Sequence, residues 1–326
     1  MPPTWQTELA QSFTDMGALL SYLDLGPSDF LEPPEAVMDF PLRVTRPYAS
    51  RIRKGDPLDP LLLQILPGAA ERMAVPGFGA DPVGDLLSVA RPGLLHKYAG
   101  RVLLISTGAC AIHCRYCFRR DFPYAGQQLA KSRERLALEA IAGDASIQEV
   151  ILSGGDPLIL SDERIKSLIK AIAAIPHVRR LRFHSRIPVV LPSRIDAGFL
   201  AAVSASPLRV VMVIHANHPQ ELDEPVREAV RTMLNQGITV LNQSVLLKGV
   251  NDDAECLIAL SERLFDQGVL PYYLHLMDKA QGTAHFDVPE HEAQALMATL
   301  RQRLPGYLVP KLVREIAGDP YKRPMG

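Results

Sequence analysis

Apolar residues gather into six short runs in the part of the chain that follows Tyr98. The runs are rich in Val, Ile and Leu and do not alternate with polar residues, which is typical of parallel strands covered on both faces. Stretches with helical periodicity separate them, and from the second run onward the strands begin about every 30 residues, the length of a βα unit. The predicted strands are residues 101–106, 149–152, 181–184, 209–215, 239–246 and 271–276, and the predicted helices include 132–142, 162–173, 223–236 and 252–266.

Strands linked in this way form either an open doubly wound sheet or a barrel, because crossovers between parallel strands are right-handed. Six βα units are too few for a closed eight-stranded barrel, so we predict an α/β fold built on a partial (β/α)6 barrel. A further extended segment is expected at residues 307–316. We assign the barrel to residues 98–288, an N-terminal extension to 1–97, and a C-terminal helix with a short segment that closes the site to 289–326.

The N-terminal extension contains many of the 27 prolines of the chain. Proline interrupts helices and lacks a backbone donor, so this extension is expected to be mostly short helices joined by ordered loops. Its apolar periodicity predicts an amphipathic helix over residues 6–24 and a shorter helix over residues 61–72.

The composition is that of a globular protein, with 47% hydrophobic and 22% charged residues. The net charge of -1 argues against a general nucleic-acid binder and against a membrane-surface protein, since both usually carry a basic excess. No apolar run is long enough to span a bilayer. The N-terminus has neither the basic nor the apolar region of a signal peptide, so we expect a cytoplasmic protein.

Three of the four cysteines, Cys110, Cys114 and Cys117, lie within eight residues, directly after the first predicted strand. A disulfide framework would not cluster them, so the C-x3-C-x2-C spacing indicates a metal or cluster site. Three thiolates can bind three irons of a [4Fe–4S] cluster and leave the fourth iron open to another ligand. The alternatives are a zinc site completed by His113 or Cys256, and three unrelated buried cysteines.

Polar residues and glycines follow most of the other predicted strands. The C-terminal ends of the strands carry the active site in β/α folds, so these residues predict one site at one mouth of the barrel. They are Ser153, Gly154, Gly155 and Asp156 after the second strand, Ser185 and Arg186 after the third, His215 and Asn217 after the fourth, and Asp278 after the sixth.

The cysteine motif, with an aromatic residue before its last cysteine, resembles that of the radical S-adenosylmethionine (SAM) superfamily. LSGGDPL, one βα unit later, is similar to the glycine-rich segment that contacts the methionyl amine of SAM in that family. The resemblance implies a [4Fe–4S] cluster on the three cysteines and reductive cleavage of SAM to a 5′-deoxyadenosyl radical. A histidine at a strand end is otherwise most often structural. The SAM contacts implied are Ser153, Gly154, Gly155, Asp156, His215 and Asn217.

Further motifs narrow the resemblance to the lysine 2,3-aminomutases, which also use pyridoxal phosphate. They occur in that family's order and spacing over residues 90–324. The chain is similar to the short form of the family, without a zinc-binding tail, which includes the β-lysylation enzymes of translation elongation factor P. Its N-terminal segment resembles theirs as well. The motifs are CRYCFRR, LSGGDPL, SRIPVVLPSRI, HANHP, NQSVLLKGVND, PYYLHLMD and GYLVP.

The resemblance implies a binding site for pyridoxal phosphate around Lys322, which falls where the family has its cofactor lysine. A lysine near a chain end is otherwise usually solvated. The preceding Gly-Asp-Pro-Tyr departs from the glycine-rich stretch common in the family, which leaves the loop geometry open. Arg101 and Gln243 match positions at or near the cofactor phosphate, where a guanidinium fork is suited, and Tyr98 matches one beside the ring.

The resemblance also implies a substrate site. Arg119 matches the residue that pairs with the α-carboxylate, and Asp278 matches one of two acids that bind the distal ammonium of lysine. Glu315 stands at the position of the second acid, which is aspartate in the family, so reach or substrate size differs here. Two carboxylates suit an ammonium because its three N–H donors need acceptors and its charge needs compensation. Without the resemblance, the alternative for Asp278 is a helix N-cap after a strand, which is common.

These resemblances predict an isomerase that converts L-α-lysine to β-lysine, with electrons from a flavodoxin- or ferredoxin-type donor. The product is expected to serve β-lysylation of elongation factor P through its lysyl ligase. The alternatives are an aminomutase that makes free β-lysine or acts on another amino acid, and a non-enzymatic zinc or iron–sulfur binding module.

Overall fold

The computed structural model describes residues 4–35, 40–127, 129 and 131–326 of the chain. Its strands form one ten-stranded sheet. In chain order the strands are β1 (Val89–Arg91), β2 (Leu94–Tyr98), β3 (Arg101–Thr107), β4 (Glu149–Gly154), β5 (Arg180–Ser185), β6 (Arg209–Ile214), β7 (Thr239–Val245), β8 (Leu270–His275), β9 (Lys311–Arg314) and β10 (Arg323–Pro324).

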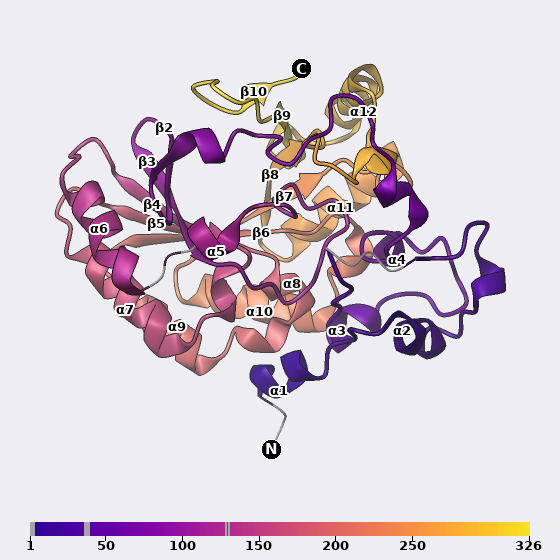
Figure 1. Cartoon of the computed structure of the whole chain (residues 1–326), viewed down its shortest axis with the longest axis horizontal. Helices are drawn as coiled ribbons and strands as arrows, with labels where there is room; N and C mark the ends of the chain where they lie inside the picture. Colours follow the sequence, from indigo (N-terminus) through magenta and orange to yellow (C-terminus); the bar gives the residue numbers. More distant parts are fainter. Residues whose placement is uncertain (1–3, 36–39, 128, 130) are drawn as a thin grey trace.

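Strands that follow each other along the chain are also neighbours in the sheet. Every pair from β3 to β9 is parallel, whereas β1–β2, β2–β3 and β9–β10 are antiparallel. Within the described residues β1 and β10 do not pair with each other, so the sheet is curved but open (Figure 1). The predicted partial barrel is therefore confirmed: its six strands are β3 to β8, and β9 continues it within the extended segment predicted for residues 307–316.

Helices connect the strands and cover the outer side of the sheet. Figure 1 shows α6, α7, α9 and α10 following one another along one side, and α1 to α3 at the opposite end of the molecule from β9 and β10. None of the helices in the described residues has the length and apolar content needed to cross a bilayer. The α-helices are α1 (Trp5–Ala10), α2 (Met16–Tyr22), α3 (Arg46–Ala49), α4 (Pro60–Leu63), α5 (Tyr124–Gln127), α6 (Lys131–Ala142), α7 (Asp162–Ala173), α8 (Ile187–Val190), α9 (Ala197–Ser204), α10 (Glu224–Asn235), α11 (Ala254–Asp266) and α12 (Glu290–Arg303).

The local sequence explains the regular elements, as α7 illustrates. Its apolar residues recur at helical spacing and are buried in the main hydrophobic core. Ser161 caps its N-terminus by accepting a hydrogen bond from the backbone N–H of Arg164. The buried face consists of Ile165, Leu168, Ile169 and Ile172.

The side chains of β5 alternate between the two faces of the sheet. Leu181 and Phe183 are fully buried in the core between sheet and helices. Arg180, Arg182 and His184 lie on the other face and line the inside of the curved sheet. The inner face of β5 is therefore polar, and the cavity that it lines mixes polar and apolar side chains.

The N-terminal extension differs from its prediction. The single helix predicted for residues 6–24 is wrong: Phe13 pairs with Val44 in a β-bridge, and this separates α1 from α2. The helix predicted for residues 61–72 is also wrong, because helical structure is confined to α4 and a 3-10 turn at Ala69–Arg72. The pattern does not predict β1 and β2, which lie mostly within the segment expected to be helical.

Candidate functional site

A cavity of about 790 Å³ lies inside the curved sheet. Its wall is formed by the inner faces of the strands and by the loops that follow them. Of the residues expected at the strand ends or given a role by the resemblance, all but Ser185 and Asn217 line this cavity. The candidates that line it are Tyr98, Arg101, Cys110, Cys114, Cys117, Arg119, Ser153, Gly154, Gly155, Asp156, His215, Gln243, Asp278, Glu315 and Lys322.

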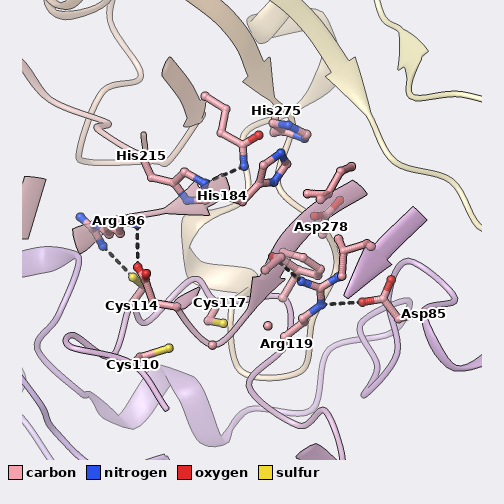
Figure 2. A pocket seen from close by; sticks show the side chains of 18 of the residues that line it. Asp85, Cys110, Cys114, Cys117, Arg119, His184, Arg186, His215, His275 and Asp278 are labelled. Atoms are coloured by element: carbon pink, nitrogen blue, oxygen red, sulfur yellow. Dashed lines mark hydrogen bonds and ion pairs between the residues drawn. The ribbon is translucent and has the colours of Figure 1, made fainter. Parts of the chain in front are cut away.

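The three cysteines lie on the loop that follows β3, and their side chains border one end of the cavity, which we call the cysteine end (Figure 2). Burial is the main cause that raises the pKa of Cys110 well above its usual range and the pKa of Cys117 to about 11. Arg186 donates from Nη1 to Sγ of Cys114 over 2.7 Å. Hydrogen bonds to sulfur are among the contacts by which proteins tune iron–sulfur clusters.

Among the described residues, no three His, Cys, Asp or Glu side chains are placed to hold a single metal ion. Of the two alternative zinc ligands, His113 donates from Nδ1 to the carbonyl of Pro41 (2.7 Å) and stacks on Phe40, and Cys256 lies in α11.

The glycine pair after β4 packs directly on the backbone of the cysteine loop. Gly155 donates its N–H to the carbonyl of Thr107 (2.8 Å), and Asp156 donates to that of Ala109 (2.8 Å). Gly154 has a φ of 123°, and a Cβ at either glycine would overlap a backbone carbonyl oxygen of the loop. Glycine is thus required here by close approach and, at Gly154, by backbone conformation.

The cysteine end is clamped from the N-terminal extension by Glu71, which sequence reasoning did not identify. Its carboxylate accepts from Nε and Nη2 of Arg115 (2.7 Å for Nε) and from Nη2 of Arg120 (2.8 Å). Both guanidinium groups also lie over the ring of Phe40, at 4.7 and 4.8 Å. Because Arg115 stands between two of the cysteines, this buried cluster fixes the path of their loop.

A second buried network lies behind the cysteines and includes Asn217. Arg186 donates from Nη2 to Gln64 (2.7 Å) and to Glu221 (3.0 Å). Asn217 donates to the same Gln64 oxygen (3.0 Å) and to the hydroxyl of Tyr116 (2.7 Å). In this structure the Asn217 side chain therefore orders the support of Arg186 instead of facing the cavity.

We call the part of the cavity formed by Asp85, Lys97, Glu315 and Lys322 the lysine end. Nζ of Lys97 lies 2.5 Å from Oδ1 of Asp85 and 2.8 Å from Oε1 of Glu315. The other oxygen of Asp85 accepts from Nε of Arg119 at 2.6 Å (Figure 2), and the other oxygen of Glu315 pairs with Nζ of Lys322. A series of alternating charges thus connects Arg119 to Lys322.

Three carboxylates in this region differ in their ionisation. Burial opposes the charged form, but the adjacent cations hold the pKa values of Asp85 and Glu315 below their usual range. Asp278 has a buried oxygen without a hydrogen-bond partner, and burial raises its pKa to about 7. Asp278 is therefore the carboxylate of this site that lacks a close cation.

Histidines form the wall between the two ends. His215 contacts Gln243 through its Nε2 (3.0 Å), and burial with nearby cations lowers its pKa to about 3 (Figure 2). His184 and His275 are buried as well, and their Nε2 atoms have no hydrogen-bond partner. Sequence reasoning missed these two residues, together with Asp85 and Lys97. The alternation of polar and apolar residues along β5 is the sequence signal that could have marked His184 as inward-facing.

Comparison with known proteins first gives the class. An open parallel sheet with three cysteines after its first parallel strand defines a radical SAM protein, and residues 104–258 match the Radical SAM superfamily. That class implies a [4Fe–4S] cluster and SAM, and the cysteine end has the sulfur donors for the cluster.

Relatives then give the family. The chain is 47% identical over 322 residues to L-lysine 2,3-aminomutase of Escherichia coli (strain K12), covering 98% of this chain and 94% of the relative. It is 47% identical over 318 residues to the enzyme of the same name from Haemophilus influenzae, with coverage of 98% and 94%. The Clostridium subterminale L-lysine 2,3-aminomutase is 33% identical over 324 residues, which cover 98% of this chain and 77% of that one. The chain belongs to the L-lysine 2,3-aminomutase family of radical SAM isomerases.

Proposed function

We propose that this chain is a lysine 2,3-aminomutase that converts L-α-lysine to β-lysine with a [4Fe–4S] cluster, SAM and pyridoxal phosphate. The observation that carries the proposal is one cavity lined by three cysteine thiols, the amine of Lys322, the guanidinium of Arg119 and the carboxylate of Asp278. When bound, the cluster and SAM supply a carbon radical that takes hydrogen, and pyridoxal phosphate supplies the conjugated aldehyde on which an amino group migrates.

The polar side chains on the inner face of the sheet fit pyridoxal phosphate. The cofactor carries a phosphate and a phenolic oxygen, both of which need hydrogen-bond donors. The buried Nε2 atoms of His184 and His275 lack partners, and Arg101 and Gln243 face the same cavity. In the proposal Arg101 and Gln243 bind the phosphate, Tyr98 lies beside the ring, and Lys322 attaches the cofactor.

The cysteine end would hold the cluster and SAM. Cys110, Cys114 and Cys117 are the proposed iron ligands, and Arg186 compensates their charge. The glycine pair, packed on the cysteine loop, also lines the cavity, and its backbone is the proposed contact for the methionyl part of SAM. We assign SAM binding to Ser153, Gly154, Gly155, Asp156 and His215, and a supporting position to Asn217.

The substrate would lie between the two ends. Arg119 is buried but stays charged beside Asp85, which suits an α-carboxylate. Asp278 and Glu315 would accept the distal ammonium. The unpaired carboxyl of Asp278 gains most from a cation, because burial raises its pKa to about 7 when it has none. A substrate held at both its carboxylate and its ammonium would present one C–H bond to the radical.

The direct test is an anaerobic assay. The reconstituted, reduced protein is incubated with L-lysine, SAM and pyridoxal phosphate, and β-lysine is sought by mass spectrometry. We expect β-lysine from the wild type and none from Cys114→Ala or Lys322→Ala. Cys114→Ala should lose iron and keep covalent pyridoxal phosphate, and Lys322→Ala should show the reverse.

Two results would reject parts of the proposal. Cleavage of SAM without β-lysine would reject lysine as the substrate and direct attention to Asp278 and Glu315. Loss of both cofactors in both variants would mean that they report misfolding rather than two separate sites, which circular dichroism would reveal.

The destination of the product rests on the resemblance to the elongation factor P β-lysylation enzymes. We propose that in the cytoplasm β-lysine is the donor for elongation factor P through its lysyl ligase, and that a flavodoxin or ferredoxin supplies electrons. Deleting the gene should remove a β-lysyl mass increment from elongation factor P. An unchanged mass would favour β-lysine as a free metabolite.

A further inference from the structure

Lys97 occupies the centre of the charge series at the lysine end. Its ammonium has three acceptors: Asp85 at 2.5 Å, Glu315 at 2.8 Å and the carbonyl of Val83 at 2.9 Å. An ammonium has three N–H donors, so Lys97 is saturated by the protein itself. It is therefore an internal counter-ion and not a free binding group for a ligand.

We propose that Lys97 is a positioning residue that keeps Lys322 reactive toward the aldehyde of its cofactor at neutral pH. The inference rests on the proposed function, in which Lys322 attaches pyridoxal phosphate. Lys97 shares Glu315 with Lys322 and so prevents that carboxylate from stabilising the Lys322 ammonium alone. An amine attacks an aldehyde only in its unprotonated form, so this sharing affects the rate of attachment.

The charges explain the sign of the effect. Removing Lys97 leaves an excess of negative charge beside Lys322, which makes its ammonium harder to deprotonate. The pairs are buried, so solvent screens this change little. The cations and carboxylates of this region balance, three against three: Arg119, Lys97 and Lys322 against Asp85, Glu315 and Asp278.

The other groups around Lys322 do not titrate where the effect is expected. Burial, with the charge of Lys322, lowers the pKa values of the three neighbouring histidines, so they are neutral in mild alkali. Glu315 is ionised throughout. Asp278, with a pKa of about 7, titrates near neutrality, so the midpoints of the variants are compared above that pH. The groups facing Lys322 are Glu315 on the segment after β9, Asp278 after β8, His184 on β5, His215 after β6 and His275 on β8.

The experiment measures attachment of pyridoxal phosphate to Lys322 against pH. The full chain is mixed with pyridoxal phosphate, trapped with borohydride at set times, and the labelled peptide is quantified by mass spectrometry. This readout needs neither the cluster nor SAM. In Lys97→Gln, which keeps donors but removes the charge, the midpoint of the pH–rate profile should rise by about one unit, and the rate at neutral pH should fall about tenfold.

Matched variants separate charge from structure. Lys97→Arg keeps the charge and should restore the wild-type midpoint. Asp85→Asn removes a negative charge from the same series, so its midpoint should move in the opposite direction. Lys54→Gln breaks an exposed lysine pair, with Asp24 at 3.1 Å, and should leave the profile unchanged.

The outcomes separate the cofactor assignment of Lys322 from the role of Lys97. If the wild type is not labelled at Lys322 at any pH, both the cofactor assignment and the inference fail. If the wild type is labelled and Lys97→Gln has the same midpoint, the inference alone fails. Should Lys97→Gln not fold, an Asp85→Asn midpoint equal to or above that of the wild type would overturn the inference.

Discussion

The cysteine end and the lysine end of the cavity both depend on residues that are distant in the sequence, yet they are held in different ways. At the cysteine end, Glu71 clamps two arginines, and the glycine pair packs without space against the loop backbone. At the lysine end, alternating charges hold one another, and one buried carboxyl, Asp278, is left without a close cation.

The difference matches what each end has to do. A cluster needs ligands at fixed positions, and the cysteine loop is accordingly held by close packing and by buried ion pairs. In the proposed function the amine of Lys322 forms and releases a bond, and such a role suits surroundings that are balanced in charge rather than locked in shape. We therefore expect steric changes to have the largest effects among variants at the cysteine end. At the lysine end, we expect the effects of variants to depend most on pH.

The strongest test of this difference is Glu71→Gln. The substitution leaves two buried guanidinium groups without their carboxylate, which should lower the free energy of unfolding by about 3–5 kcal/mol. Urea denaturation of the protein without cofactors measures it. The control Glu255→Gln breaks an exposed pair with Arg303 and should leave the free energy nearly unchanged. Equal effects of the two variants would show that the clamp is not structural.

A steric test of the cysteine end is Gly155→Ala. The added Cβ would overlap the carbonyl of Ala109 and displace the cysteine loop, at a cost of about 1–3 kcal/mol. Urea denaturation, with the iron content after reconstitution, gives the result. Gly306→Ala is the matched control, because nothing lies within 4 Å of its Cβ position. Full iron loading and unchanged stability of Gly155→Ala would contradict the close packing described for this end.

The smallest effect, and the one most sensitive to pH, is expected for Asp278→Asn. Burial raises the pKa of Asp278 from its usual 3.8 to about 7, so the folded state binds more protons than the unfolded state between these values. Stability therefore falls as pH rises through this window, and asparagine removes that loss. The melting temperature without cofactors should rise by roughly 2 °C at pH 8 and not at pH 4.

An exposed carboxylate provides the comparison for Asp278. Glu262→Gln on α11 should show no such dependence on pH. A melting temperature of Asp278→Asn that is lower than wild type at pH 8 would mean that Asp278 holds a cation in the folded protein. The lysine end would then be locked in the same manner as the cysteine end.

Much of the fold follows from local sequence. The apolar residues give the strands from β3 to β8 to within about two residues at most ends, because every strand packs at least one apolar face on the covering helices. The inner faces depart from the expected continuous apolar runs, since β5 and β7 alternate and turn polar side chains into the cavity. The helix predicted over residues 162–173 coincides with α7 for the same kind of local reason, namely its periodicity and its serine cap. Local sequence does not predict the structure of the N-terminal extension, since the contact of Phe13 with Val44 has no local signature.

The candidate site also contains residues that the sequence predicts and residues that it does not. Cysteine spacing and strand-end positions pointed to residues that now line one cavity. Sequence patterns do not identify Glu71, Asp85 and Lys97, because each acts through a partner that only the folded chain brings close. Asn217 illustrates the converse, since a polar residue at a strand end is drawn here into a supporting network.

The long reach of the Lys97–Glu315 pair has a consequence for the order in which the protein forms. Each ladder of the sheet joins strands that are consecutive in the chain, so the sheet can extend as the chain is synthesised. Lys97 and Glu315 are 218 positions apart, and closing so long a loop is entropically costly until the strands between them are in place. The charge balance around Lys322 is thus a late event in folding. If Lys322 attaches pyridoxal phosphate as proposed, attachment would follow completion of the fold, so an early trapped intermediate should contain the sheet and bind no pyridoxal phosphate.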